Sequence, residues 1–239
     1  METNKRLLLI SNSTHFGRDY LDHVADEILD FLGSIQKVLF VPYALHDPDG
    51  YAAKAKARFN QMDLELTSIH QAADPQQAIK QAESLFIGGG NTFRLLNTLY
   101  KLNLLETIKR RVGEGMVYIG ASAGSNVAGP TIKTTNDMPI VEPPSFAALG
   151  LVSFQLNPHY LDADSKTTHM GETREERLLQ FLEDNDTPVL ALREGSFVRV
   201  ENESVLLKGF TNGRLFRKGC EPLEVAPGSK VEIRFESQA

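Results

Sequence analysis

Short runs of almost purely apolar residues recur along the chain, and they constrain its fold more than any other feature. A strand that is buried on both faces consists of such a run, whereas a half-buried strand alternates apolar with polar residues. The runs are residues 7–10, 38–41, 85–87, 116–119 and 189–192. Their lengths match strands rather than helices, so they predict a parallel sheet that is covered on both sides.

Segments with helical patterns lie between these runs. Apolar residues within 21–32 are spaced three and four apart, and Gly33 follows where a helix cap is expected. Asp74 before Pro75 is typical of a helix start, and residues 173–176 have the spacing of a capping box. The alternation predicts an α/β fold with a mostly parallel central sheet flanked by helices.

The pattern changes after residue 196. Short alternating segments separated by Gly and Asn predict antiparallel strands or hairpins near the C-terminus. These segments are residues 197–200, 205–207, 215–216 and 231–235. Residues 129–144 are rich in Thr, Asn, Asp and Pro without any period, and they predict a long loop of the kind that is often functional. We expect residues 1–239 to form one domain.

Composition indicates the cellular compartment of the protein and the classes of partner that it does not bind. The only cysteine, Cys220, has no partner for an internal disulfide, which favours the cytoplasm. No stretch approaches the ~20 apolar residues of a membrane span, and the run 7–10 is too short for a secretory signal. With 25 Lys and Arg against 31 Asp and Glu, the net charge of −6 argues against a nucleic-acid binder. We therefore expect neither nucleic acid nor membrane as a partner.

A serine flanked by small residues follows the run 116–119. The order Gly120, Ala121, Ser122, Ala123, Gly124 is typical of a nucleophile elbow, a sharp turn between a buried strand and a helix. Such a turn exposes the serine hydroxyl at the end of the sheet. The alternative is an ordinary glycine-rich turn that happens to contain a serine.

Three glycines, residues 88–90, close the run 85–87 and precede a second helical pattern. Their backbone N–H groups can point into one concavity, so Gly89 or Gly90, together with Ala123, are candidates for an oxyanion hole. A phosphate cradle is the competing use of this geometry. The segment lacks the Lys and Ser/Thr of a P-loop, which weakens that alternative.

His159 follows the apolar segment 151–156 at the expected end of a strand, where catalytic groups of open α/β sheets gather. A serine hydroxyl needs such a base to become nucleophilic. The other five histidines lack this context, although His15 comes close.

Two carboxylates compete as the third member of a catalytic triad. Glu194 follows the run 189–192 at a strand end, whereas Asp137 lies in the long loop. A carboxylate that orients an imidazole is expected on a rigid element, so Glu194 is favoured. Asp137 is then a contact for a substrate amine or an organiser of the loop.

Together these segments closely resemble the peptidase E, or aspartyl dipeptidase, family of serine peptidases. The matching segments are residues 9–14 (LISNST), 88–93 (GGGNTF), 118–124 (YIGASAG), 134–141 (TTNDMPIV), 157–159 (NPH) and 171–175 (GETRE). They occur in the family's order, from residue 7 to about residue 195. Two positions depart from the family's bacterial members, Arg193 where Pro is expected and Ala121 where a larger aromatic residue occurs.

The resemblance implies a fold like that of the class I glutamine amidotransferases, which is flavodoxin-like, with Ser122 in place of their cysteine. It implies hydrolysis of dipeptides with an N-terminal aspartate through an acyl-enzyme, without a metal or organic cofactor. The family's serine and histidine correspond to Ser122 and His159, and its acidic partner corresponds to Glu194 or Asp137. The oligomeric state stays open, with a homodimer as one alternative.

The aspartate side chain of such a substrate needs a positive partner. Our candidate is Arg174, in the first turn of a capped helix, with Lys133, Arg94 and His15 as alternatives. Asn91 and Thr135 are further candidates for substrate binding.

Three other functions compete with this prediction. An α/β-hydrolase esterase would place its histidine late in the chain, and no histidine follows His169. A cyanophycinase-like peptidase would use the same serine on β-aspartyl bonds. A non-catalytic amidotransferase-like binding module would retain Ser122 without using it.

Overall fold

The computed structural model describes residues 5–164, 166, 168 and 170–233. His169 and residues 234–235 of the expected C-terminal strand lie outside the described residues. Within the described residues, no helix is long and apolar enough to cross a membrane.

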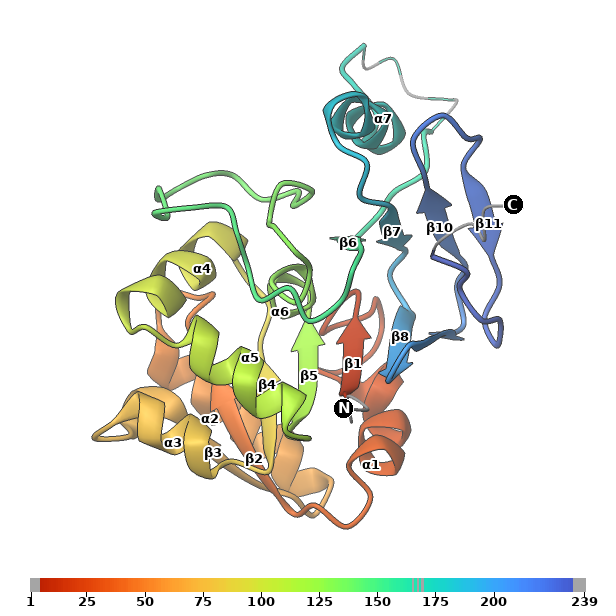
Figure 1. Ribbon diagram of the computed structural model, residues 1–239. Coiled ribbons are helices and arrows are strands. Elements are labelled where there is room, and N and C mark those ends of the chain that lie inside the picture. The colour runs from red at the N-terminus through yellow and green to blue at the C-terminus, as the bar shows by residue number, and fades with distance from the viewer. Residues whose placement is uncertain (1–4, 165, 167, 169, 234–239) are drawn as a thin grey trace.

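A seven-stranded sheet forms the centre of the fold, in the order β3-β2-β4-β5-β1-β8-β9 (Figure 1). Strands β1 to β5 run parallel to one another, and β8 and β9 add an antiparallel edge beside β1. The apolar runs predict β1, β2, β4 and β5, whereas they miss β3, in which only alternate residues are buried. The bounds are β1 Arg6–Ile10, β2 Lys37–Val41, β3 Glu65–Ser68, β4 Ser84–Ile87, β5 Val117–Ala121, β8 Ser196–Glu201 and β9 Ser204–Gly209. The expected α/β class with a mostly parallel central sheet is confirmed.

Helices cover both faces of this sheet and bury its two sets of side chains in separate clusters. On one face, α1 and α2 pack through residues such as Ile28 and Phe59. On the other face, α3, α4 and α5 pack through Ile79, Leu95 and Ile108. The bounds are α1 Ala25–Leu32, α2 Pro48–Gln61, α3 Pro75–Gln81, α4 Thr92–Lys101 and α5 Leu105–Gly113, with short 3-10 helices η1 Asp22–Val24 and η2 Ile69–Gln71.

A second, four-stranded sheet has the order β11-β10-β7-β6 and packs against α7 (Figure 1). Its strands are β6 Gln155–Pro158, β7 Val189–Leu192, β10 Gly213–Phe216 and β11 Leu223–Val225, and α7 spans Arg174–Asp184. Thr173 caps α7 through the predicted capping box. The run 189–192 therefore forms a strand, but this strand lies outside the central sheet. A strand's own sequence does not say which sheet it joins.

The prediction of a C-terminal strand at residues 231–235 is wrong for residues 231–233, the part that the structure describes. Lys230 forms an isolated bridge with Leu206, and the Val231 N–H donates to the Val205 carbonyl, but residues 231–233 form no strand. One bridge is too short a ladder to extend the sheet. Residues 129–144 form the expected loop, which continues to the start of β6.

Candidate active site

Ser122 occupies a strained turn between β5 and the short helix α6, Ala123–Asn126. Its φ of 51° and ψ of −108° are rare for a residue with a side chain. The turn is held because the Ser122 N–H donates to the Ile10 carbonyl at 2.9 Å. This backbone conformation places the Ser122 hydroxyl beyond the carboxyl end of β5, as a nucleophile elbow requires.

The two glycines of the elbow are required by the closeness of neighbouring backbone. A Cβ atom on Gly124 would lie 2.1 Å from the Ile87 carbonyl oxygen. A Cβ on Gly120 would lie 2.5 Å from the Gly124 carbonyl oxygen. Real Cβ contacts are never this short, so the G-x-S-x-G spacing is a packing requirement of this turn.

His159 and Glu194 form a hydrogen-bonded chain with Ser122. The His159 Nε2 atom lies 3.1 Å from Ser122 Oγ, and its Nδ1 atom lies 2.7 Å from Glu194 Oε1. The three residues follow β5, β6 and β7, so the ends of two different sheets meet here. The His159 and Glu194 side chains are 42% and 43% exposed, so a substrate can reach them. With Nδ1–H donating to the carboxylate, Nε2 is free to accept the serine proton.

Asp137 lies at the N-terminus of α4 instead of beside the imidazole. Its Oδ2 atom accepts from the Thr92 N–H at 2.7 Å and from the Thr92 hydroxyl at 2.6 Å, and Thr135 Oγ1 lies 3.2 Å away. Asn91 caps the same helix and donates to the Met138 carbonyl. Asp137, Asn91 and Thr135 therefore fasten the long loop to α4, and in the described part of the chain no hydrogen bond joins Asp137 to His159.

The glycine loop after β4 leaves one N–H group available. The Gly88 N–H donates to the Val41 carbonyl. Burial raises the pKa of Tyr51, and the hydrogen bond from the Gly89 backbone to the Tyr51 hydroxyl opposes that rise. The Gly90 N–H has no hydrogen-bond partner among the described residues. The N–H of Ala123, the first residue of α6, has no acceptor within its helix.

Arg174 begins α7 and is half-buried. Burial lowers the pKa of its guanidinium, the charge of Arg177 lowers it further, and the charge of Asp137 raises it. Arg174 is therefore within electrostatic range of Asp137, and among the described residues it forms no hydrogen bond or ion pair. Of the alternative cations, His15 packs edge-on against Phe210, with ring centroids 4.9 Å apart.

Sequence reasoning missed the role of the end of β1. Three consecutive residues there each bond to backbone near one triad member. The Ile10 carbonyl accepts from the Ser122 N–H, the Ser11 hydroxyl accepts from the His159 N–H at 3.0 Å, and Asn12 Oδ1 accepts from the N–H of the residue after Glu194 at 2.8 Å. Ser11 also donates to the carbonyl of the last residue of β7. Two small polar residues directly after a buried apolar run were the available signal.

Arg193, one of the two departures from the family pattern, pairs with residues outside the triad. Its guanidinium pairs with Asp162 at 2.6 Å and Glu224 at 2.8 Å, and it lies over the Tyr160 ring at 5.5 Å from the centroid. These contacts hold the pKa of both carboxyls below their usual range. Ala121, the other departure, is fully buried at the end of β5.

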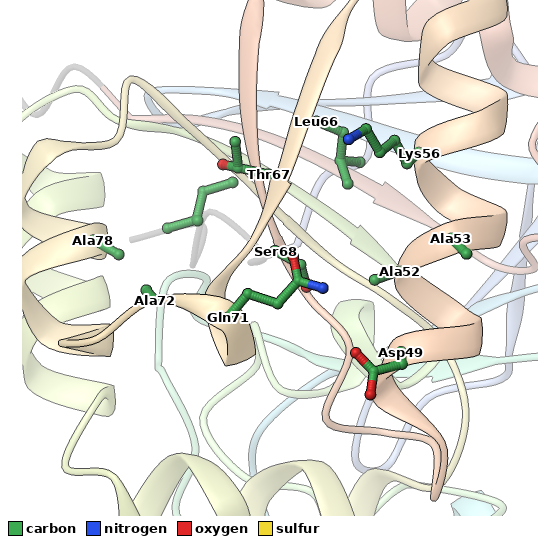
Figure 2. Close-up of a pocket in the computed structure, with 11 residues that line it drawn as sticks. Asp49, Ala52, Ala53, Lys56, Leu66, Thr67, Ser68, Gln71, Ala72 and Ala78 are labelled. Carbon is green, nitrogen blue, oxygen red and sulfur yellow. The ribbon is translucent and has the colours of Figure 1, made fainter.

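A second hydrogen-bonded set of Ser, His and Asp side chains lies at the β3 edge of the central sheet, but its serine is not at a nucleophile elbow. Ser68 Oγ lies 2.7 Å from His70 Nδ1, and His70 Nε2 lies 3.0 Å from Asp49 Oδ1. Asp49 and Ser68 line a cavity of about 510 Å³ between α2 and β3 (Figure 2). Ser68 is buried and has an ordinary extended backbone, with φ −113° and ψ 130°. Ser68 thus lacks the strained backbone of Ser122, and Ser122 does not line this cavity.

The chain is similar to known proteins over nearly its whole length. The model of peptidase family S51 matches residues 7–208. Peptidase E of Streptomyces coelicolor is 52% identical over 225 residues, covering 94% of this chain and 93% of that protein. A probable alpha-aspartyl dipeptidase of Drosophila melanogaster is 45% identical over 230 residues, covering 95% and 96%.

Solved structures show the same fold. A peptidase from an acI-B1 actinobacterium has a TM-score of 0.72 at 15% identity, covering 96% of this chain and 97% of its own. A putative peptidase E from Listeria monocytogenes has a TM-score of 0.66 at 22% identity, covering 87% and 99%. The extent of the family match and of the sequence identity shows that this chain belongs to peptidase family S51, as its motifs predict.

Proposed function

We propose that this protein is a serine dipeptidase that cleaves dipeptides with an N-terminal L-aspartate. The observation that carries the proposal is the hydrogen-bonded chain from Glu194 through His159 to Ser122 at a strained elbow. Membership of family S51 and the printed names of its relatives, peptidase E and probable alpha-aspartyl dipeptidase, support the same activity.

In the first step the imidazole of His159 takes the proton from Ser122, and the serine oxygen attacks the scissile carbonyl carbon. Glu194 holds the imidazole in the required tautomer and stabilises its charged form. The carbonyl oxygen becomes an oxyanion, and the N–H groups of Gly90 and Ala123 are the donors for it. Gly89 contributes its lack of a side chain, because a Cβ there would lie 3.0 Å from Ser122 Cβ.

In the second step the imidazolium gives its proton to the leaving amine, and the peptide bond breaks. Aspartate is left as an ester on Ser122. The same imidazole then activates a water molecule, which attacks the ester carbonyl and releases aspartate. The residues of this site supply the nucleophile, the base and the oxyanion donors, so the proposed mechanism contains no step by a metal or an organic cofactor.

Recognition of the aspartyl residue is assigned to Arg174 and Asp137. A guanidinium can meet the side-chain carboxylate with two charge-assisted hydrogen bonds. Arg174 is half-buried and has no partner among the described residues, so its charge is available. The Asp137 carboxylate, which accepts hydrogen bonds from Thr92 and Thr135, is the contact for the substrate's ammonium group.

Replacement of Ser122 by Ala tests the enzyme assignment. Removing one oxygen from the turn should leave the circular dichroism spectrum and melting temperature unchanged, while kcat falls by as much as ~10⁶-fold, as in other triads. Residual activity above about one-hundredth of the wild-type value would contradict the assignment. Absence of turnover by the folded wild-type protein would favour the binding module.

Specificity is tested with Asp-Leu, Asn-Leu, Glu-Leu and β-aspartyl-Leu. We expect a strong preference for Asp-Leu that is reduced roughly 100-fold or more in Arg174→Met, because the substrate carboxylate would lose its charged partner. Arg177→Met is the matched control, since Arg177 is exposed on the next turn of α7 and pairs with Glu172. Preferential cleavage of β-aspartyl-Leu would replace the proposal with the cyanophycinase-like activity.

We also propose a cytoplasmic location, which the single cysteine, Cys220, supports. The proposed catalysis requires a small dipeptide as its partner. Cell fractionation tests the location.

A further inference from the structure

A cavity of about 440 Å³ lies beside the nucleophile, and no step of the proposed mechanism uses it. It lies where the loops after three strands of the central sheet meet. Ser13 follows β1, Leu45 and Asp47 follow β2, and Gly89 and Gly90 follow β4. Ligands of open α/β sheets bind at this carboxyl edge of the strands.

The cavity and Ser122 share a wall. A Cβ built on Gly89 would lie 3.6 Å from the Ser122 hydroxyl oxygen, so the main chain of Gly89 separates the nucleophile from the cavity by a single backbone thickness. Gly90, the proposed oxyanion donor, lines the cavity as well. A substrate whose carbonyl oxygen lies against Gly90 is therefore at the cavity's edge.

The cavity lies toward the opposite face of the sheet from the groups assigned to the aspartyl residue. Its tyrosines, Tyr20 and Tyr51, belong to the core cluster under α1 and α2. The loop that carries Asp137 is anchored through Ile132 in the cluster under α3, α4 and α5. If the aspartyl residue extends from Ser122 toward Asp137, the other half of the dipeptide extends toward the cavity.

The lining suits an amino acid with an apolar side chain and a free carboxylate. Leu45 and the rings of Tyr20 and Tyr51 supply apolar wall. Lys54, on the exposed side of α2, brings its ammonium group 4.8 Å from the centre of the Tyr20 ring. Among the described residues it has no ion pair or hydrogen bond.

The acidic residue of the cavity is already engaged. Asp47 caps α2, and its carboxylate accepts from the Gly50 N–H at 3.0 Å. Burial raises the pKa of Tyr20 and Tyr51, so both hydroxyls stay neutral. Lys54 is thus the cavity's only cationic lining residue in the described part of the chain.

We infer that this cavity binds the leaving residue of the dipeptide and that the ammonium group of Lys54 pairs with its C-terminal carboxylate. The inference rests on the proposed function and adds the basis for preferring a dipeptide. A longer or amidated peptide presents a neutral amide where a dipeptide presents a negative charge, so it gains nothing from Lys54.

Lys54→Met tests the inference with two substrates, Asp-Leu and Asp-Leu-amide. For Asp-Leu we expect KM to rise about tenfold with kcat nearly unchanged, the size of a partly screened charge-assisted hydrogen bond. For Asp-Leu-amide both constants should stay at their wild-type values. Lys56→Met is the matched control, because Lys56 lies on the same helix but lines the other cavity, and it should change neither substrate.

An equal effect of Lys54→Met on both substrates, or no effect on either, would overturn the inference. Lys54→Arg should retain most of the affinity for Asp-Leu, whereas loss equal to that of Lys54→Met would also count against a charge contact. If the proposed function itself is wrong, the outcome is distinguishable, because the wild-type protein would then not hydrolyse Asp-Leu at all.

Discussion

The hydroxyl of Ser11 should control the position of the catalytic histidine, and Ser11→Ala measures how much depends on it. Ser11 is fully buried; its hydroxyl group accepts from the His159 N–H at 3.0 Å and donates to the Leu192 carbonyl at 2.8 Å. The Leu192 carbonyl keeps a second bond, from the Tyr160 N–H at 3.0 Å. The substitution therefore leaves one backbone donor, that of His159, without a partner.

An unpaired buried N–H costs about 1–3 kcal/mol. His159 is also held at a φ of 55°, where a side chain is unfavourable, so the backbone should relax once the bond is lost. If that free energy is needed to restore the reactive geometry, kcat falls roughly 10- to 100-fold. KM should change little, because Ser11 lies beneath the histidine and does not reach the substrate.

The assay is steady-state hydrolysis of Asp-Leu together with urea unfolding, for Ser11→Ala and for Ser84→Ala. Ser84 is the matched control, since it is also fully buried and donates to a backbone carbonyl, that of Lys37 at 2.8 Å, at the opposite end of its strand from the catalytic edge. Both variants should lose similar stability, but only Ser11→Ala should lose kcat, and Ser11→Thr should recover part of it. A wild-type kcat in Ser11→Ala would refute the positioning role.

Three further predictions address the acid, the elbow and the ion pairs. Glu194→Gln should lower kcat by up to ~10⁴-fold through loss of the correct tautomer, while Asp137→Asn should mainly raise KM; the reverse ranking in steady-state kinetics would exchange their roles. Gly124→Ala should cost about 1–3 kcal/mol in urea unfolding and abolish turnover, whereas Gly113→Ala, with open space around its Cβ, should be silent. Arg193→Met should lower the free energy of unfolding at pH 7 by about 1 kcal/mol, a value reduced for solvent screening. Arg193 depresses the pKa of its two carboxylate partners, so its contribution is present above their unfolded pKa values, near 4, and is lost as the pH falls through the folded ones. A difference between Arg193→Met and wild type that is the same at pH 7 and pH 3 would contradict this.

Local sequence patterns predicted the strands and helices that depend on local burial. The five apolar runs all form strands, and the capping box at Thr173 starts α7. The elbow was also predictable, because only a chain with Gly at 120 and 124 can bring backbone so close around Ser122. Strands β3 and β11 were missed, since β3 buries only alternate residues and β11 has three residues, two of which are exposed.

The tertiary structure alone decided which strand ends became neighbours. Ser122, His159 and Glu194 are separated by 37 and 35 residues, and they meet because β6 and β7 form a second sheet whose ends face the central one. Tertiary packing also placed Asp137 against the N-terminus of α4, and it gave Ser11 and Asn12 their contacts across the sheets. The neighbours of a residue in sequence determine whether it lies in a buried strand or in a turn. Strand order depends instead on the packing of the whole chain, which no local pattern predicts.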